Sequence, residues 1–159
     1  MAILRHFTAT GFVVDGDQVL LHWHPKVGAW LPPGGHIDEN EAPVQAVLRE
    51  VHEEAGVRAE VVSSAPALGL EYPAEVAPPF TIMVEDIHDP EAGFHQHIDM
   101  IYFCRLAGPA EPLNYRWIWV GRRSLAEGLP IEQVDSPVEP PPEDVRLLAL
   151  RAFDIVAGR

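Results

Sequence analysis

One amphipathic segment, from about Ala42 to Ala55, constrains the fold more than any other part of the sequence. Its apolar side chains recur at helical spacing, and Gly56 follows it as a suitable stop signal. These apolar positions are Val44, Val47, Leu48, Val51 and Ala55. The segments on both sides are rich in β-forming and turn residues. A helix with one apolar face between strands packs on a sheet, so we expect an α/β layered fold with a mixed sheet.

The flanking segments predict how the rest of the chain is organised. Two β-rich runs surround Asp15-Gly16-Asp17, which is a hairpin signal. Residues 26–41 are dense in Gly and Pro, and we expect them to form a loop with little regular structure. Further strands are expected within residues 57–72, 80–88, 96–106 and 115–120. A last helix is expected from about Glu143 to Ala157, with Pro142 at its entry and Val145, Leu148, Ala152 and Ile155 facing inward.

Length and charge limit the number of domains and the kinds of partner that we expect for this chain. Its 159 residues suit a single domain, residues 1–159, with a sizeable core. A formal charge of −13 argues against nucleic acid or an anionic membrane as the main partner. Cys104 is the only cysteine, and Arg5 and His6 interrupt the N-terminal region where a signal peptide needs an apolar run. We therefore expect a cytoplasmic protein without a membrane span.

Three carboxylates lie close together on the expected helix. Glu50, Glu53 and Glu54 have the spacing i, i+3, i+4, which places them on one flank. Like charges at this spacing cost a few tenths of a kcal/mol per pair, and a bound cation would relieve that repulsion. Oxygen ligands favour a hard ion, so the sequence predicts a site for Mg²⁺ (or Mn²⁺) that a pyrophosphate group completes.

The wider stretch "GHIDENEAPVQAVLREVHEEAGV", residues 35–57, carries a specific pattern. Its fixed positions are Gly35, Glu41, Arg49, Glu50, Glu53, Glu54 and Gly56, with apolar Val51 and Val57. This is the complete signature of the Nudix hydrolases, and the chain resembles that family. The resemblance implies an α/β/α sandwich in which the signature forms a loop–helix–loop. It also implies Mg²⁺-dependent hydrolysis of a pyrophosphate bond in a nucleoside diphosphate linked to another group.

The resemblance assigns roles position by position. Glu50, Glu53 and Glu54 match the family's metal carboxylates, and the backbone carbonyl of Gly34 often joins them. Arg49 matches the residue that orients a ligand carboxylate. Many relatives place a further Glu before the late Trp-containing strand, where this chain has only Glu111. Glu111, Glu50 or a metal-held hydroxide therefore stay open as the general base.

A second polar pattern follows the signature. On a strand, His95, His97 and Asp99 point to one face, which is unusual for a core strand. These residues are candidates for contacting the substrate or its phosphates, for supporting the metals, or for a transition-metal site of their own. Hydrogen-bonded structural histidines are the alternative. Lys26, before Trp30, is a candidate phosphate contact.

The sequence leaves the substrate and the roles of several aromatic side chains open. A nucleotide-sensing domain without turnover and an RNA 5′-pyrophosphohydrolase are the alternatives to a hydrolase of small nucleotides. The aromatic side chains Trp23, Trp30, Tyr72 and Phe80 are candidate nucleobase platforms, of which we expect at least two to be core residues. Cys104 is expected to be a core residue rather than a nucleophile. The sequence does not reveal the oligomeric state; a homodimer stays open, since dimers are common among soluble proteins.

Overall fold

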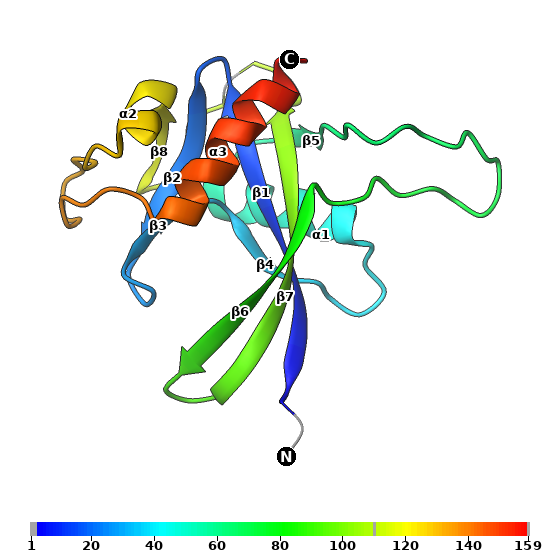
Figure 1. Ribbon diagram of the computed structural model, residues 1–159, viewed down its shortest axis with the longest axis horizontal. Helices are drawn as coiled ribbons and strands as arrows, with labels where there is room; N and C mark the ends of the chain where they lie inside the picture. The colour runs from blue at the N-terminus through cyan, green and yellow to red at the C-terminus, as the bar shows by residue number, and fades with distance from the viewer. Residues whose placement is uncertain (1–2, 110, 159) are drawn as a thin grey trace.

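The first two strands form the predicted hairpin and stand at the centre of a mixed sheet (Figure 1). The computed structural model describes residues 3–109 and 111–158. Strand β1 (Arg5–Asp15) turns back into β2 (Gln18–His24). On its other side β1 runs parallel to β7 (Gly93–Leu106), whereas the remaining strand pairs are antiparallel.

Shorter strands extend the sheet on both sides. Strands β3 (Ala29–Leu31) and β8 (Trp117–Gly121) pair with β2, β4 (Gly34–His36) pairs with β1, and β5 (Ala59–Val61) and β6 (Thr81–Asp89) pair with β7. The predicted mixed sheet is confirmed, because parallel and antiparallel pairs meet on β1.

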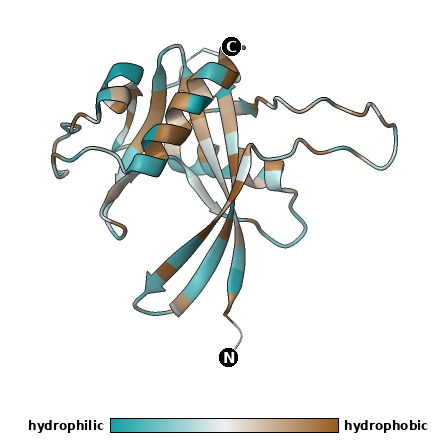
Figure 2. Cartoon of the chain, in the orientation of Figure 1, coloured by the Kyte–Doolittle hydropathy of each residue, from teal (hydrophilic) through white to brown (hydrophobic). Residues whose placement is uncertain are grey.

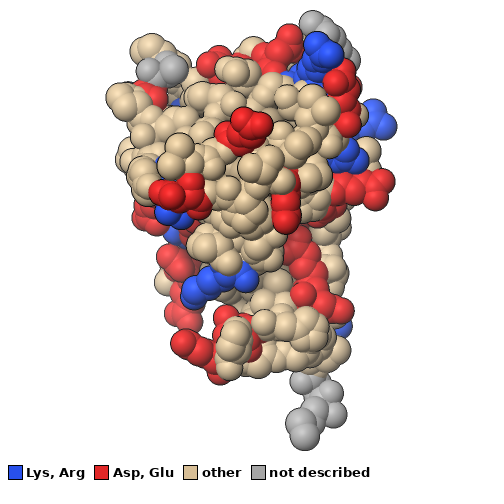
Figure 3. Space-filling model, turned by 90° about the vertical axis from the view of Figure 1, so that its left-hand side faces the viewer, with Lys and Arg blue, Asp and Glu red and all other residues tan. Residues whose placement is uncertain are grey.

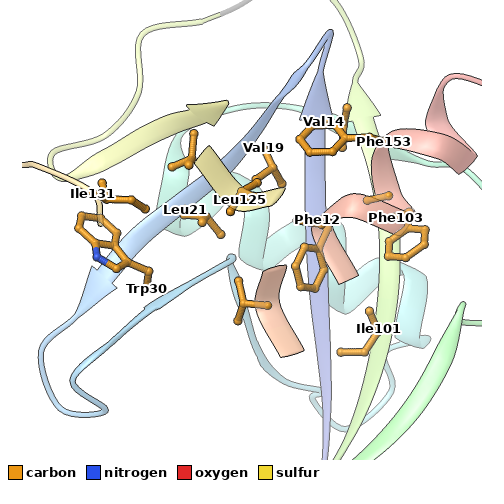
Figure 4. Packing of buried hydrophobic residues seen from close by; sticks show 14 of the residues in the cluster. Phe12, Val14, Val19, Leu21, Trp30, Ile101, Phe103, Leu125, Ile131 and Phe153 are labelled. Carbon is orange, nitrogen blue, oxygen red and sulfur yellow. The ribbon is translucent and has the colours of Figure 1, made fainter. Parts of the chain in front are cut away.

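Helices cover the two faces of the sheet, which confirms the predicted α/β/α sandwich. Helix α1 (Pro43–Ala55) packs on one face through the predicted apolar stripe. Helix α3 (Glu143–Val156) packs on the other face, where Phe153 meets a cluster that contains Phe12 and Phe103 (Figure 4). None of the helices in the described ranges is long and apolar enough to cross a membrane.

The structure corrects three expectations about the connecting segments. The expected loop at residues 26–41 contains β3 and β4, because Trp30 is fully buried and the backbone of β4 pairs with β1. Of residues 57–72 only β5 is a strand, since Pro66 and Gly69 interrupt the run that follows. Helix α2 (Arg122–Glu127) was not predicted, because six residues are too few to show a helical period.

One part of the sheet extends beyond both helices. The paired ends of β6 and β7 and the first half of β1 project from the sandwich, and we call them the projecting arm (Figure 1). Its residues are mostly hydrophilic (Figure 2). The predicted alternation on β7 is confirmed, since His95 and Asp99 are buried and lie on the same face of the strand.

Candidate active site

Helix α1 is held at both ends, and its C-terminal end carries the acidic residues. At the start, the Gln45 side chain accepts a hydrogen bond from the Ala42 N–H at 2.8 Å. At the end, Gly56 adopts the left-handed conformation (φ 79°) that favours glycine. The Asn114 side chain donates to the carbonyls of Glu53 and Glu54 at 3.3 and 3.0 Å. Asn114 therefore fixes the last turn of α1.

Sequence reasoning missed Asn114, and its role predicts a measurable loss of stability. We expect Asn114→Ala to lower the free energy of unfolding by about 1–2 kcal/mol, because two donors to helix carbonyls are lost. Asn114→Asp keeps the shape but places a negative charge at the negative end of the helix dipole, so its loss is expected to be larger. Urea denaturation measures both. A stability equal to that of the wild type in both variants would contradict this role.

Arg49 organises the carboxylates around α1. Its Nε and Nη2 atoms donate to the two carboxylate oxygens of Glu41 at 2.8 and 3.0 Å. Its Nη1 atom donates to Glu50 at 2.7 Å and to Glu53 at 3.2 Å, and Nη2 also donates to the His36 carbonyl at 3.1 Å. The bond from Arg49 holds the pKa of Glu41 below its usual value. Glu41 thus anchors Arg49, and Arg49 orients two of the predicted metal carboxylates.

The glycine loop of β4 supports the other acidic side chains. The Gly34 N–H donates to Oε2 of Glu54 at 3.0 Å. A methyl group on Gly35 would lie 2.5 Å from Oε1 of Glu50, so only glycine lets the carboxylate come this close. Burial raises the pKa of Glu54 to about 7, and the charges of Glu50 and Glu53 add to the rise.

The donor set suits a hard divalent cation. The carboxylates of Glu50, Glu53 and Glu54 come from one helical flank, and Glu54 carries the unfavourable like-charge interaction that the sequence predicted. A cation among these oxygens offsets both the repulsion and the loss of hydration. The Gly34 carbonyl stays a predicted ligand; the hydrogen bond that joins this residue to a carboxylate is through its N–H.

A pocket of about 180 Å³ opens beside these carboxylates, between the sheet and α3. Gly34 and Glu54 belong both to the acidic site and to the pocket wall. The apolar lining residues are Phe12, Leu31, Pro32, Met83, Ile101, Val145 and Leu148, and the polar ones include Thr10, His22, His24, Glu85, Asp99 and Asp144. The pocket wall is therefore about as polar as it is apolar, and four of its side chains, those of Glu54, Glu85, Asp99 and Asp144, are carboxylic acids.

Two strands hold the buried carboxylate of Asp99 in this pocket. Thr8 and Thr10 on β1 donate to its two oxygens at 3.0 and 2.8 Å. Burial raises the pKa of Asp99 despite these bonds. Glu85 on β6 lines the same pocket, and burial, with added effects from Asp99 and Asp144, raises its pKa to about 7.

The raised pKa of Glu85 predicts how stability changes with pH in EDTA. The folded state holds the Glu85 proton more tightly than the unfolded chain, where the pKa is near 4.5. Stability from this group is therefore present at low pH and lost as the pH rises through about 7. We expect Glu85→Gln to reduce the fall in unfolding free energy between about pH 5 and pH 8. Glu91→Gln, at an exposed turn residue, is the control and should leave the slope unchanged; an unchanged slope in Glu85→Gln as well would refute the prediction.

Two pocket histidines were not singled out from the sequence. His22 stacks on Trp117 with ring centroids 4.1 Å apart, and burial, with a smaller effect from His24, lowers its pKa to about 4. His22 is therefore neutral at pH 7. The sequence carried a pattern that could have identified them: "LHWH", residues 21–24, alternates polar and apolar residues in the same way as the run at His95.

Some predicted site residues lie elsewhere. Glu111 forms an ion pair with Arg58 at 2.7 Å and does not line the pocket. Lys26 is exposed in the turn between β2 and β3. Asp99 lines the pocket, whereas His95 and His97 lie on the projecting arm in a group of histidine rings.

Of the aromatic candidates, Trp23 and Trp30 are core residues, as at least two were expected to be, and Tyr72 and Phe80 are exposed. Cys104 is fully buried, which confirms the expectation of a core residue.

A known protein family matches the part of the chain that contains this loop, helix and sheet. The NUDIX domain matches residues 4–134, which is most of the chain. The chain belongs to the Nudix hydrolase family. A solved NUDIX-family hydrolase from Clostridium perfringens is similar over 96% of this chain and 98% of that one, with 27% sequence identity and a TM-score of 0.76. The C. elegans Ap4A hydrolase shares the fold, with 17% identity over 98% of this chain and 99% of that one and a TM-score of 0.54.

Curated relatives of this Nudix hydrolase match over shorter stretches. An RNA pyrophosphohydrolase from Pseudoalteromonas translucida is 39% identical over 54 residues, which are 33% of this chain and 31% of that protein. A probable DHNTP pyrophosphohydrolase from Lactococcus lactis is 29% identical over 99 residues, 62% of this chain and 53% of that protein. The matches thus span about a third to a half of the length of these relatives.

Proposed function

We propose that this Nudix hydrolase cleaves the pyrophosphate bond of a small nucleoside diphosphate derivative, with Mg²⁺ (or Mn²⁺) as its cofactor. One observation carries the proposal: Glu54 and Gly34 belong both to the acidic site that Arg49 organises and to the wall of the pocket. A group that enters the pocket therefore has its attached phosphates beside the carboxylates.

The residues of this chain supply orientation and charge. Arg49 holds the carboxylates of Glu50 and Glu53, and the Gly34 N–H holds that of Glu54, so each of the three side chains is oriented by a hydrogen bond. A divalent ion held by Glu50, Glu53 and Glu54 would supply positive charge for the diphosphate and would make a water molecule more acidic for attack on phosphorus. Glu111 is engaged by Arg58 outside the pocket, so we assign no step to it.

The size and lining of the pocket favour a small substrate. Its volume of about 180 Å³ is below the roughly 300–1,000 Å³ typical of whole-ligand sites, so it suits one part of a nucleotide, such as its ring. Phe12, Met83 and Ile101 provide apolar walls, and Glu85 and Asp99 provide polar groups for a ring edge. The relative named as a probable DHNTP pyrophosphohydrolase agrees with a small substrate of this kind.

An RNA 5′ end is the second candidate, because a curated relative at 39% identity is named an RNA pyrophosphohydrolase. The formal charge of −13 disfavours it. Among the described residues on the face in Figure 3, acidic side chains are interspersed with basic ones, without a continuous basic stripe. We therefore place a small nucleotide first.

A substrate screen tests the proposal. Purified protein is incubated with ADP-ribose, nucleotide sugars, dinucleoside polyphosphates, nucleoside triphosphates and a triphosphorylated RNA, each with Mg²⁺, with Mn²⁺ and with EDTA. Mass spectrometry should show metal-dependent loss of a small compound and two phosphorylated products. Turnover of the RNA alone would favour the second candidate. Binding of a nucleotide without any product would favour a sensing domain and overturn the proposal.

A further inference from the structure

Three histidine rings of the projecting arm meet the ring of His36 on β4, outside the pocket. His95 and His97 lie on β7, His6 lies on β1 and His36 on β4. Ring centroids are 5.0 Å apart for His6 and His95, 5.1 Å for His95 and His97, and 5.0 Å for His36 and His97. Side chains two residues apart on a strand share a face, and the parallel pairing sets His6 directly opposite His97. The fold therefore gathers residues far apart in the sequence.

We propose that His6, His95 and His97 form a second metal site, for a borderline transition ion such as Zn²⁺, separate from the carboxylate site. One ring nitrogen from each residue lies within 4.8 Å of the other two. Tetrahedral Zn²⁺ at 2.0–2.1 Å from each nitrogen needs nitrogens about 3.4 Å apart. Small rotations of the three rings cover this difference.

In two of the three rings, those of His95 and His6, the second nitrogen is arranged as in metal-bound histidines. His95 Nδ1 lies 3.0 Å from the Gly93 carbonyl, a bond in which the ring donates and which leaves Nε2 with its lone pair. His6 Nδ1 lies 3.3 Å from His36 Nε2, so His36 positions the His6 ring. A backbone carbonyl or neighbouring side chain on the second nitrogen is the usual way in which proteins orient imidazole ligands.

The ring of His97 has a nitrogen that lacks a hydrogen-bond partner among the described residues, which points to a bound ligand. This nitrogen is the Nε2 atom, and it is buried. Buried polar atoms are normally satisfied, so an unpaired nitrogen on a ring that packs against two other imidazoles calls for a partner that accepts its lone pair.

Two carboxyl groups lie next to the three histidines. Glu85 pairs with His97 across the strands, and Asp99 follows His97 on the same face. The imidazole set selects a different ion from the carboxylate set, because nitrogen ligands suit zinc and its neighbours whereas Mg²⁺ takes oxygen ligands. With three protein ligands, the ion would tie β1 to β7 where neither helix covers the sheet.

Calorimetry on tag-free, metal-stripped protein tests the proposal. Zn²⁺ is titrated into wild type in a large excess of Mg²⁺, which occupies the carboxylate site. We expect one equivalent to bind, and we expect the affinity to fall at least 10-fold in His97→Gln and in His6→Gln. His88→Gln, at an exposed histidine of β6 outside the group, is the matched control and should bind as wild type does. Absence of Zn²⁺ binding by wild type would overturn the proposal.

Two further measurements cover the remaining outcomes. The variant His22→Gln tests the pocket histidines; loss of zinc binding there, with binding kept in His97→Gln, would place the ion in the pocket and refute the proposed site. X-ray absorption of the wild-type zinc complex does not depend on the folding of any variant. Three imidazole nitrogens at 2.0–2.1 Å are expected, and a shell of oxygen atoms alone would contradict the site.

Discussion

Glu54→Gln is expected to lower kcat about 1,000-fold, which corresponds to about 4 kcal/mol of transition-state stabilisation. The amide cannot supply the charge that a carboxylate gives to a divalent ion. Its oxygen still accepts the hydrogen bond from Gly34, so the loop and helix keep their contact. The measurement is metal-dependent turnover of the compound that the substrate screen identifies.

Stability separates a loss of chemistry from a loss of fold in this variant. Burial disfavours the charged form of Glu54, so the metal-free variant at pH 8 should be as stable as the wild type or more stable. Glu39→Gln is the control, since it removes an exposed carboxylate in the loop between β4 and α1. It should keep wild-type kcat. Full activity in Glu54→Gln would refute the role of this residue.

Arg49→Lys is expected to lower kcat about 10- to 100-fold although the charge is kept. Lysine is a compact point charge and cannot reproduce the fork that reaches Glu41, Glu50 and the His36 carbonyl together. Glu50 and the His36 carbonyl then lose the hydrogen bonds that Arg49 donates to both. We therefore also expect the free energy of unfolding to fall by about 1–3 kcal/mol. Steady-state kinetics and urea denaturation measure the two effects.

The chain offers a matched control for this substitution. Arg123→Lys makes the same chemical change at an exposed arginine whose ion pair with Glu127 spans one helical turn. Exposed pairs of this kind contribute little, so activity and stability should equal those of wild type. If Arg49→Lys behaved in the same way, Arg49 would be an ordinary surface ion pair and not the organiser of the acidic site.

The local features of this protein were determined by the sequence alone. Helix α1, its stop at Gly56 and the clustering of Glu50, Glu53 and Glu54 follow from the geometry of one helix, which is set by residues close in the chain. The hairpin at Asp15-Gly16-Asp17 was predictable for the same reason. The grouping of the three carboxylates and the α/β layering could therefore be predicted without a structure.

The tertiary structure alone decided which distant residues join the site. Thr8 and Asp99 are 91 positions apart and meet only because β1 and β7 pair in parallel. The same pairing brings His6 to His97, and the packing of α3 on the sheet places Asp144 at the pocket that holds Glu85. Strand register and helix packing depend on the burial of the whole core, so the spacing of residues within one segment does not reveal these encounters.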